Sequence, residues 1–239
     1  MPDPKYRRVL LKLSGEGLCG EGGFGIENQE LAQVAAECVG VAKAGVQLAI
    51  VIGGGNIVRG AAFSAGGAIG RAAADQMGML ATVINSLALQ EAIEKLGHKA
   101  RVHSAVNVAG VCEPFVRKRA IHQLEEKRIV ILAGGTGNPF FTTDTAAALR
   151  AAELGCDAVL KATKVDGIYS ADPRKDRSAR LFRRITYKEV LDRRLGVMDL
   201  TAIALMMENR IPLVVFNMKT PGNIARVVRG EDLGTAIDP

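Results

Sequence analysis

One stretch of this chain, 129–144 (IVILAGGTGNPFFTTD), constrains the fold more than any other. It begins with an apolar, β-branched run that is typical of a strand buried on both faces, and the run breaks abruptly into the glycine-rich sequence GGTG. Glycines at that point leave the backbone N–H groups open to a ligand, although a tight turn without a ligand would need them too. Asp144 is predicted to cap the next helix, which should end at Gly155. The polar residues between the glycines and Asp144 favour a binding loop.

The same alternation of strand and helix runs along the whole chain. Strands are predicted at 8–13, 46–52, 100–104, 129–133, 158–161 and 213–217, and helices at about 28–44, 75–96, 117–127, 144–154, 186–194, 199–209 and 221–229. Continuous apolar strands are typical of a parallel sheet covered by helices on both faces. We therefore expect an α/β fold, a three-layer αβα sandwich with a mainly parallel central sheet, in a single domain over residues 1–239.

Three details of this arrangement are also predicted. The strand at 129–133 is placed at the centre of the sheet, and 165–173 is expected to be a long functional loop. The first long helix is expected to be capped by Asn28. The apolar face of the helix at 75–96 is assigned to Met77, Leu80, Ile84 and Leu87.

Four of the predicted strands end in the same kind of sequence. The residues at these ends are KLSG at 12–15, GGGN at 53–56, GGTG at 134–137 and KATK at 161–164. The carboxyl ends of parallel strands meet at one edge of a sheet, so their ammonium, hydroxyl and bare backbone N–H groups should lie together. Polyphosphate needs such a site, because phosphoryl transfer depends on positioning and on positive charge around the migrating group. Asp144 is predicted to hold Lys12 and Lys161 in position.

The sequence also argues against several classes of protein. It has no G-x-x-x-x-G-K-[ST] loop, no protein-kinase H-R-D or D-F-G motif and no G-x-S-x-G elbow. A G-x-G-x-x-G match at 20–25 lies too far from strand and helix to be a dinucleotide fingerprint. The uncharged runs are shorter than the ~18 residues of a membrane span, and no signal-peptide pattern is found. The histidines and cysteines have no metal-ligand spacing. The four cysteines also give no disulfide framework, which favours a reducing compartment, the cytoplasm.

The positive charge of the chain is concentrated in one segment. The net charge is +6, and residues 174–194 carry nine basic and three acidic residues. Aromatic residues make up 4% of the chain and no nucleic-acid-reading motif accompanies the segment. We therefore interpret it as a solvated face or a subunit contact rather than as a site for nucleic acid.

Several motifs closely resemble those of bacterial uridylate (UMP) kinases, a branch of the amino-acid kinase superfamily. They are LKLSGE at 11–16, IGGGN at 52–56 with Arg59, ADQMGMLAT at 74–82, GNPFFTTD at 137–144 and KATKVDG at 161–167. The first and last motifs occur across the superfamily, whereas the NPFFTTD and ADxMGM blocks indicate the UMP branch. Their order and spacing match over essentially the whole chain.

The resemblance implies a transfer of the ATP γ-phosphate to UMP, which gives UDP for pyrimidine nucleotide synthesis. It implies a cytoplasmic homohexamer that is activated by GTP and inhibited by UTP. It also implies Mg²⁺ as cofactor, held mainly by the nucleotide phosphates, and neither nucleic acid nor membrane as partner. Residues about 1–150 should mainly form the UMP site, and residues about 151–239 the ATP site.

The resemblance further assigns residues to these sites. The catalytic positions are Lys12, Arg59, Asp144 and Lys161. The ATP-site positions are Lys12, Leu13, Ser14, Gly15, Gly55, Arg59, Thr163, Tyr169 and Asp172. The UMP-site positions are Gly54, Asp75, Thr136, Gly137, Asn138, Pro139, Phe140, Phe141, Thr142 and Thr143. The segment linked to GTP activation comprises Gly20, Glu21, Gly22, Gly23, Phe24 and Gly25.

Two other interpretations stay open at this stage. One is a non-catalytic nucleotide-sensing module, which would have no need of all four catalytic positions. The other is a different member of the superfamily, such as an acetylglutamate-kinase-like enzyme, for which a different acceptor block is expected. An ADP-release assay and a panel of acceptors would distinguish them.

Overall fold

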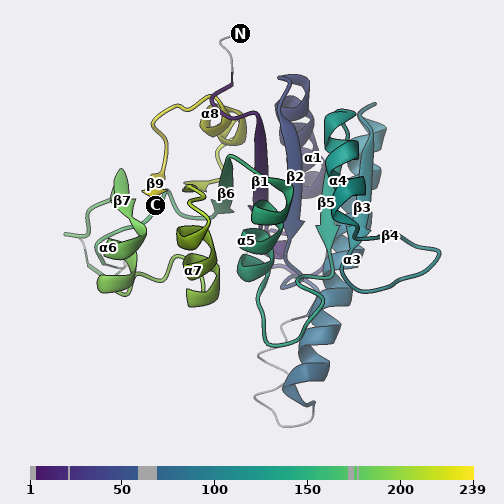
Figure 1. Ribbon diagram of the computed structural model, residues 1–239, viewed down its shortest axis with the longest axis horizontal. Helices are drawn as coiled ribbons and strands as arrows, with labels where there is room; N and C mark the ends of the chain where they lie inside the picture. The colour runs from purple at the N-terminus through teal and green to yellow at the C-terminus, as the bar shows by residue number, and fades with distance from the viewer. Residues whose placement is uncertain (1–3, 21, 59–68, 172–174, 177) are drawn as a thin grey trace.

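Continuous apolar runs form the strands, and helices that bury one face connect them (Figure 1). The computed structural model describes residues 4–20, 22–58, 69–171, 175–176 and 178–239. The strands are β1 (Arg8–Leu13), β2 (Gln47–Ile52), β3 (Ala100–Ser104), β4 (Glu113–Pro114), β5 (Ile129–Ala133), β6 (Ala158–Thr163), β7 (Arg184–Thr186), β8 (Leu213–Asn217) and β9 (Thr235–Asp238). The helices are the 3₁₀ helix η1 (Gly15–Leu18) and the α-helices α1 (Asn28–Lys43), α3 (Arg71–Lys95), α4 (Arg117–Glu125), α5 (Thr143–Leu154), α6 (Tyr187–Asp192), α7 (Leu200–Glu208) and α8 (Asn223–Val228).

All strands of the described residues belong to one sheet of nine, in the order β4-β3-β5-β2-β1-β6-β8-β9-β7. Neighbouring strands are parallel except for β8 and β9, which confirms a mainly parallel sheet. The central position belongs to β1, so the prediction that β5 is central was wrong. An apolar run indicates burial on both faces, which every inner strand shares, and it carries no information about strand order.

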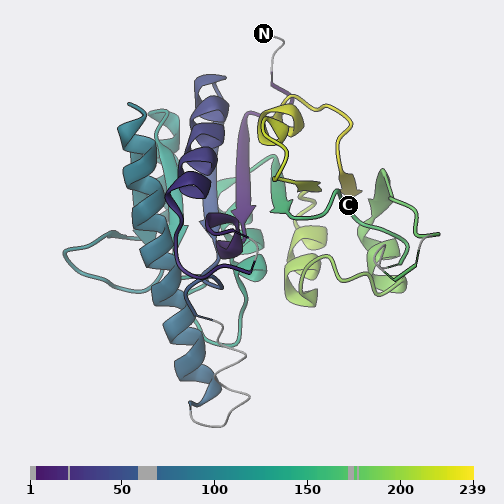
Figure 2. The same ribbon diagram turned by 180° about the vertical axis from the view of Figure 1, so that it is seen from behind.

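Helices cover both faces of the sheet, which confirms the three-layer αβα sandwich. Figure 1 shows α4, α5, α6 and α7 on one face, and Figure 2 shows α1, α3 and α8 on the other. Alternate residues of β1 serve the two cores: Val9 and Leu11 belong to the cluster under α1 and α3, whereas Leu10 belongs to the cluster under α5. The sheet therefore contributes side chains to a core on each of its faces. The carboxyl ends of its parallel strands lie at one edge.

Most predicted elements agree with the structure to within a few residues. The exceptions are β4, β7, β9 and η1, which have two to four residues and were not predicted. Asn28 is the first residue of α1 rather than its cap, which is Glu27. No helix in the described part of the chain combines the length and the apolarity that a bilayer crossing requires.

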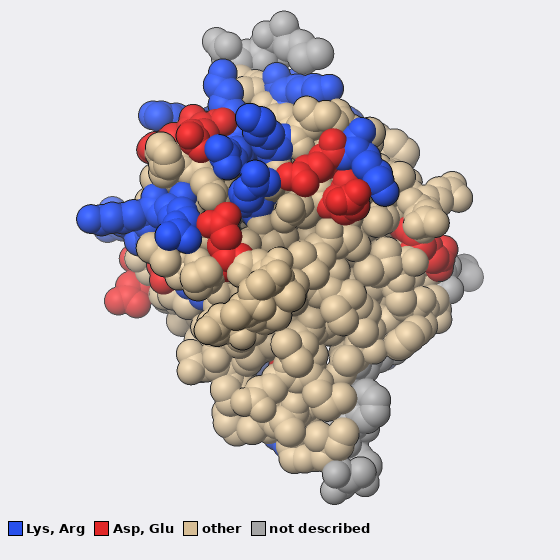
Figure 3. Space-filling view, turned by 90° about the vertical axis from the view of Figure 1, so that its right-hand side faces the viewer, with Lys and Arg blue, Asp and Glu red and all other residues tan. Residues whose placement is uncertain are grey.

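The long helix α3 begins at Arg71, earlier than predicted, and extends past the carboxyl edge of the sheet (Figure 1). Its predicted apolar face was wrong, because Leu80 and Ile84 are 51% and 50% exposed. The face that is buried instead includes the polar residue Asn85, whose partners Gly53 and Asn56 lie in a loop that the helical period cannot reveal. Figure 3 shows the side of the molecule on which α3, β3 and β4 lie, with charged residues gathered toward one end and a broad uncharged area below them.

Candidate functional site

Three charged side chains meet at the carboxyl edge of the sheet. Lys12 on β1 and Lys161 on β6 are register partners in the parallel pair, so their side chains project from the same face. Asp144 lies in the first turn of α5, with one carboxylate oxygen 2.7 Å from the Lys12 Nζ and the other 2.7 Å from the Lys161 Nζ. Lys161 also donates to the carbonyl of Val197 at 2.5 Å. The predicted arrangement of one carboxylate between two lysines is therefore present.

Asp144 is not the helix cap that the sequence predicted. Thr142 caps α5, because its Oγ1 accepts from the backbone N–H groups of Asp144 and Thr145 at 3.0 and 3.3 Å. Thr142 in turn donates to Asp199, which caps α7. Because Thr142 supplies the cap, the Asp144 carboxylate can pair with both lysines.

Burial makes the electrostatics of this cluster strong. The three side chains are 12–15% exposed. Burial opposes ionisation of Asp144, but Lys12 and Lys161 outweigh that effect and hold the pKa of the carboxyl below its ordinary value. Burial lowers the pKa of Lys161, an effect that Asp144 opposes in part and Lys12 reinforces. Two cations around one anion leave an excess positive charge in a partly desolvated place, which attracts an anionic group.

A cavity of about 170 Å³ lies on one side of the cluster, between α3 and the glycine loops after β2 and β5. Its lining includes seven of the predicted site residues, namely Gly54, Gly55, Asp75, Thr136, Phe141, Thr142 and Thr143. Four other predicted residues, Gly137, Asn138, Pro139 and Phe140, belong to the loop but are not among the lining residues. The structure thus brings most of the predicted acceptor residues around one cavity.

Asp75 fastens the loop after β5 to the start of α3. Its carboxylate accepts from the Nε of Arg71, with both oxygens at 2.9 Å, and from the backbone N–H of Phe140 at 2.7 Å. The Arg71 guanidinium also lies 5.9 Å from the centre of the Phe140 ring. Sequence reasoning missed Arg71, although its spacing of four residues from Asp75 on a helix was a usable signal.

A second cavity of about 530 Å³ lies on the other side of the cluster, between the loops after β6 and before α7. Lys161, Thr163 and Tyr169 line it together with the backbone around Val197. Apolar side chains such as Val165, Ile168 and Leu195 also line it, which suits a flat base and a sugar rather than phosphate. Three predicted residues, Arg59, Asp172 and Glu21, lie outside the described residues.

The remaining predicted ATP positions lie where β1 ends. The side chain of Leu13 is buried in the core, and its carbonyl accepts from the N–H of Gly53 at 2.9 Å. Ser14 is the residue before η1. A Cβ atom on Gly15 would lie 2.4 Å from Asn56 Oδ1 and 2.5 Å from the Gly53 carbonyl oxygen, so only glycine fits there. These residues therefore offer backbone and small groups beside Lys12.

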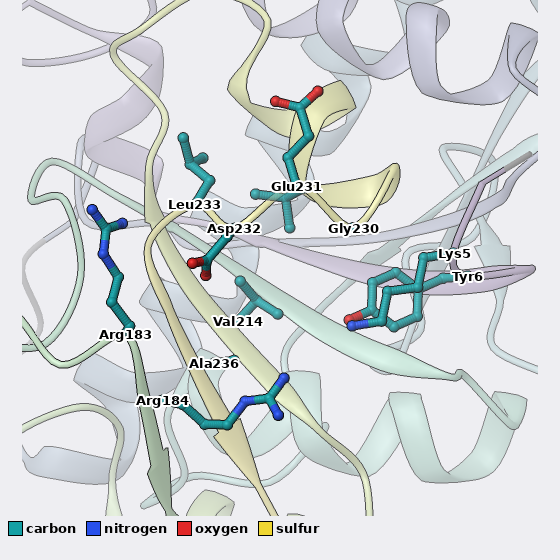
Figure 4. A pocket seen from close by; sticks show the side chains of 11 residues that line it. Lys5, Tyr6, Arg183, Arg184, Val214, Gly230, Glu231, Asp232, Leu233 and Ala236 are labelled. Atoms are coloured by element: carbon teal, nitrogen blue, oxygen red, sulfur yellow. The ribbon is translucent and has the colours of Figure 1, made fainter. Parts of the chain in front are cut away.

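A separate cavity of about 320 Å³ carries charged residues but is not a candidate for the same role (Figure 4). Figure 4 shows Arg183 and Arg184 across the cavity from Lys5 and Tyr6. Arg184 pairs with Asp238 at 3.2 Å, and the Lys5 Nζ lies 5.0 Å from the centre of the Tyr6 ring. This cavity also lies apart from the cluster of Lys12, Asp144 and Lys161, none of which lines it.

Comparisons with known proteins agree with this geometry. The profile of the Amino acid kinase family matches residues 7–217. A uridylate kinase from Paramagnetospirillum magneticum is 56% identical over 235 residues, which cover 98% of each chain. The crystal structure of UMP kinase from Bacillus anthracis has a TM-score of 0.94 at 39% identity and covers 98% of this chain and 96% of that one. The UMP kinase structure from Ureaplasma parvum has a TM-score of 0.92 at 34% identity, with 98% and 100% covered.

The family match spans most of the chain, and the similar structures share both the sheet and the length of the chain. The cluster of Lys12, Asp144 and Lys161 lies within the matched region. The chain belongs to the amino acid kinase family.

Proposed function

We propose that this chain is a UMP kinase, an ATP-dependent enzyme that transfers the γ-phosphate of ATP to UMP and releases UDP and ADP for pyrimidine nucleotide synthesis. The observation that carries the proposal is the cluster of Lys12, Asp144 and Lys161, which lies near two cavities of about 170 and 530 Å³. The uridylate kinase names of its relatives support the choice of acceptor.

The two cavities suggest how the substrates are placed. UMP binds in the cavity lined by Gly54, Asp75 and Thr136, which belongs to the N-terminal part of the chain, about residues 1–150. The nucleoside of ATP binds in the cavity lined by Thr163 and Tyr169, which belongs to the C-terminal part, about residues 151–239. The phosphates of both then meet at the lysine cluster, in line for transfer.

The residues of the cluster have distinct roles in the transfer. The ammonium groups of Lys12 and Lys161 stabilise the negative charge on the migrating phosphoryl group and on the leaving oxygens. Asp144 does not take part in bond making; it keeps both ammonium groups in position and preserves the charge of Lys161. Backbone N–H groups at Gly15 and Gly55, the hydroxyl of Ser14 and the side chain of Arg59 complete the contacts to the phosphates.

Mg²⁺ enters with ATP and is held mainly by the phosphate oxygens. Both oxygens of Asp144 are engaged by lysines, and the described residues include no group of three or more His, Cys, Asp or Glu side chains that could hold a metal. This donor set fits a metal that relies on its nucleotide, as Mg²⁺ commonly does. When bound with ATP, Mg²⁺ would neutralise part of the charge of the phosphates, beside the ammonium groups of Lys12 and Lys161.

A panel of acceptors tests the proposal. We expect ADP release with UMP, and kcat/KM lower for CMP by about tenfold or more, because a buried polar group left unpaired by the wrong base costs about 1–3 kcal/mol. N-acetylglutamate should not be phosphorylated. Comparable kcat/KM for UMP and CMP would contradict the acceptor cavity. Turnover of the amino acid would instead indicate another branch of the family, and no turnover with any acceptor would indicate a nucleotide sensor.

We also propose that the enzyme is a homo-oligomer, a hexamer by resemblance to its family. Leu80 and Ile84 are exposed apolar residues of α3. Figure 3 shows a broad uncharged area on the side of the molecule where α3 lies. An exposed apolar face of this kind fits a second copy of the same chain, since homo-oligomer contacts are largely apolar.

Replacing Ile84 tests this contact. Ile84→Lys is expected to lower the molar mass measured by size-exclusion chromatography with light scattering, because a buried charge at an apolar contact is costly. Met207→Lys is the matched control, since Met207 is an exposed apolar residue on α7, away from α3. A monomeric wild type, or an Ile84→Lys variant with unchanged mass, would overturn the assignment.

Activation by GTP and inhibition by UTP are assigned on the same resemblance. The segment 20–25 is joined to the glycine loop after β2, because the N–H of Gly25 donates to the Asn56 carbonyl at 2.8 Å. A change in this segment therefore has a direct route to the phosphate site. We place the reaction in the cytoplasm, in keeping with four free cysteines in the chain.

A further inference from the structure

The buried face of α3 presents polar side chains to the glycine loops. Thr82, Asn85 and Ser86 are at most 2% exposed. Such burial is costly unless every polar group finds a partner. Thr82 Oγ1 accepts from the N–H of Gly134 at 2.8 Å and donates to the helix carbonyl of Met79. One turn along the helix, Asn85 contacts the other glycine loop, GGGN at 53–56.

Asn85 forms a reciprocal amide pair with Asn56, the last residue of the GGGN loop. The Asn85 Nδ2 donates to Asn56 Oδ1 at 2.7 Å, and the Asn56 Nδ2 donates to Asn85 Oδ1 at 3.1 Å. The second hydrogen of the Asn85 amide is donated to the Gly53 carbonyl at 2.7 Å. The pair therefore holds the glycine loop at both of its ends.

The same pair is joined to two further segments of the chain. The Asn56 Nδ2 also donates to the carbonyl of Gly25 at 2.6 Å, and the Gly53 N–H donates to the Leu13 carbonyl at 2.9 Å. Asn56 Oδ1 also lies so close to Gly15 that no Cβ atom fits there. Four segments, β1, the GGGN loop, residues 20–25 and α3, thus meet around two buried amides.

The contacts of the GGGN loop suggest how the Asn85–Asn56 pair could affect ligand binding. With the Gly53 carbonyl held by Asn85, Gly54 and Gly55 form part of the wall of the smaller cavity. Within the described residues, the N–H groups of Gly54 and Gly55 donate to no protein acceptor. They are therefore available to a phosphate oxygen. The Gly54 N–H belongs to the same peptide as the Gly53 carbonyl, so its direction depends on the hydrogen bond from Asn85. The Gly55 N–H shares its peptide with the Gly54 carbonyl, which the N–H groups of Ile57 and Val58 hold.

We propose that Asn85 is a positioning residue for phosphoryl transfer, which acts through Asn56 and Gly53 to aim the N–H of Gly54 at the phosphates. The inference rests on the proposed kinase function and deepens it. Preorganised donors stabilise charge that develops in the transition state, so misdirected donors reduce kcat more than they weaken substrate binding.

The first test removes the amide of Asn85 and leaves a methyl side chain. Asn85→Ala is expected to lower kcat about 10- to 100-fold, with KM for UMP and ATP within about threefold, because displaced donors cost mainly transition-state stabilisation. Ser86→Ala is the matched control. Ser86 is the adjacent buried residue on α3, and its hydroxyl donates only to the helix carbonyl of Thr82, at 2.7 Å. Its kcat should stay within about twofold of the wild type.

A second variant gives a readout that a purely structural role would not produce. In Asn85→Asp the carboxylate loses the donor to the Gly53 carbonyl, whereas the protonated carboxyl regains one, and burial raises the pKa of such a group. We expect kcat of Asn85→Asp, relative to wild type at the same pH, to rise as the pH is lowered from 8 to 6. This variant also preserves the test if Asn85→Ala does not fold.

The outcomes separate this inference from the proposed function. If the wild type phosphorylates UMP but Asn85→Ala retains kcat, or if Ser86→Ala loses as much, Asn85 is only structural and the proposal is wrong. A flat ratio of Asn85→Asp to wild-type kcat across the pH range would also overturn it. If the wild type phosphorylates no acceptor, the kinase assignment itself has failed.

Discussion

Asp144→Asn is expected to lower kcat about 10²- to 10³-fold, because the ammonium groups of Lys12 and Lys161 would lose the carboxylate that positions them both. KM for ATP and UMP should change much less, since backbone N–H groups and Arg59 still bind the ground state. The capping of α5 is not affected, because Thr142 supplies that cap. Steady-state kinetics and the melting temperature of the variant measure both effects.

The melting temperature of Asp144→Asn provides a second observable. Without nucleotide the variant should be less stable, since Lys12 and Lys161 would be left as partly buried cations without an anion. Added ATP should stabilise the variant more than the wild type, because its phosphates supply the missing negative charge. Asp157→Asn is the control: Asp157 accepts from the N–H groups of Arg7 and Arg8 at the start of β1, so its loss should affect stability and not kcat. An Asp144→Asn variant that keeps wild-type kcat would show that Asp144 has no catalytic role.

Lys161→Gln is expected to cause a loss of similar size, about 10²- to 10³-fold in kcat at neutral pH. Glutamine can still donate to the carbonyl of Val197, so the change tests charge more than hydrogen bonding. Lys43→Gln is the matched control, because Lys43 is an exposed lysine at the end of α1. If the two variants had equal kcat, the charge of Lys161 would not contribute to the reaction.

The pH dependence of the same residue adds an independent check. Burial lowers the pKa of Lys161 below the ordinary 10.5, so the wild type should lose activity as the pH rises through that lowered pKa. Asp144 opposes the shift, and its removal in Asp144→Asn should therefore move the alkaline loss to lower pH. An alkaline limb at the same pH in both enzymes would contradict the electrostatic coupling of the pair.

Local sequence was sufficient to predict most of the elements. The apolar runs of β1, β2, β3, β5, β6 and β8 and the glycines that end them identified these strands correctly. The same signals failed for β4, β7 and β9, which have two to four residues and are defined by pairing with other strands. Such short strands depend on that pairing more than on their own composition.

A mainly parallel α/β sandwich, with lysines and glycines at the carboxyl edge of its sheet, could be inferred from the sequence, because both follow from residue periodicity and from the way parallel strands end. Which groups touch at that edge became known from the folded chain. The tertiary structure gave the cap of α5 to Thr142 and freed Asp144 for Lys12 and Lys161. It also turned Asn85 inward and Ile84 outward on α3. Hydrophobic periodicity indicates which face of an element is buried. The partner of a buried polar group comes from a distant segment, so it is known only when the chain has folded.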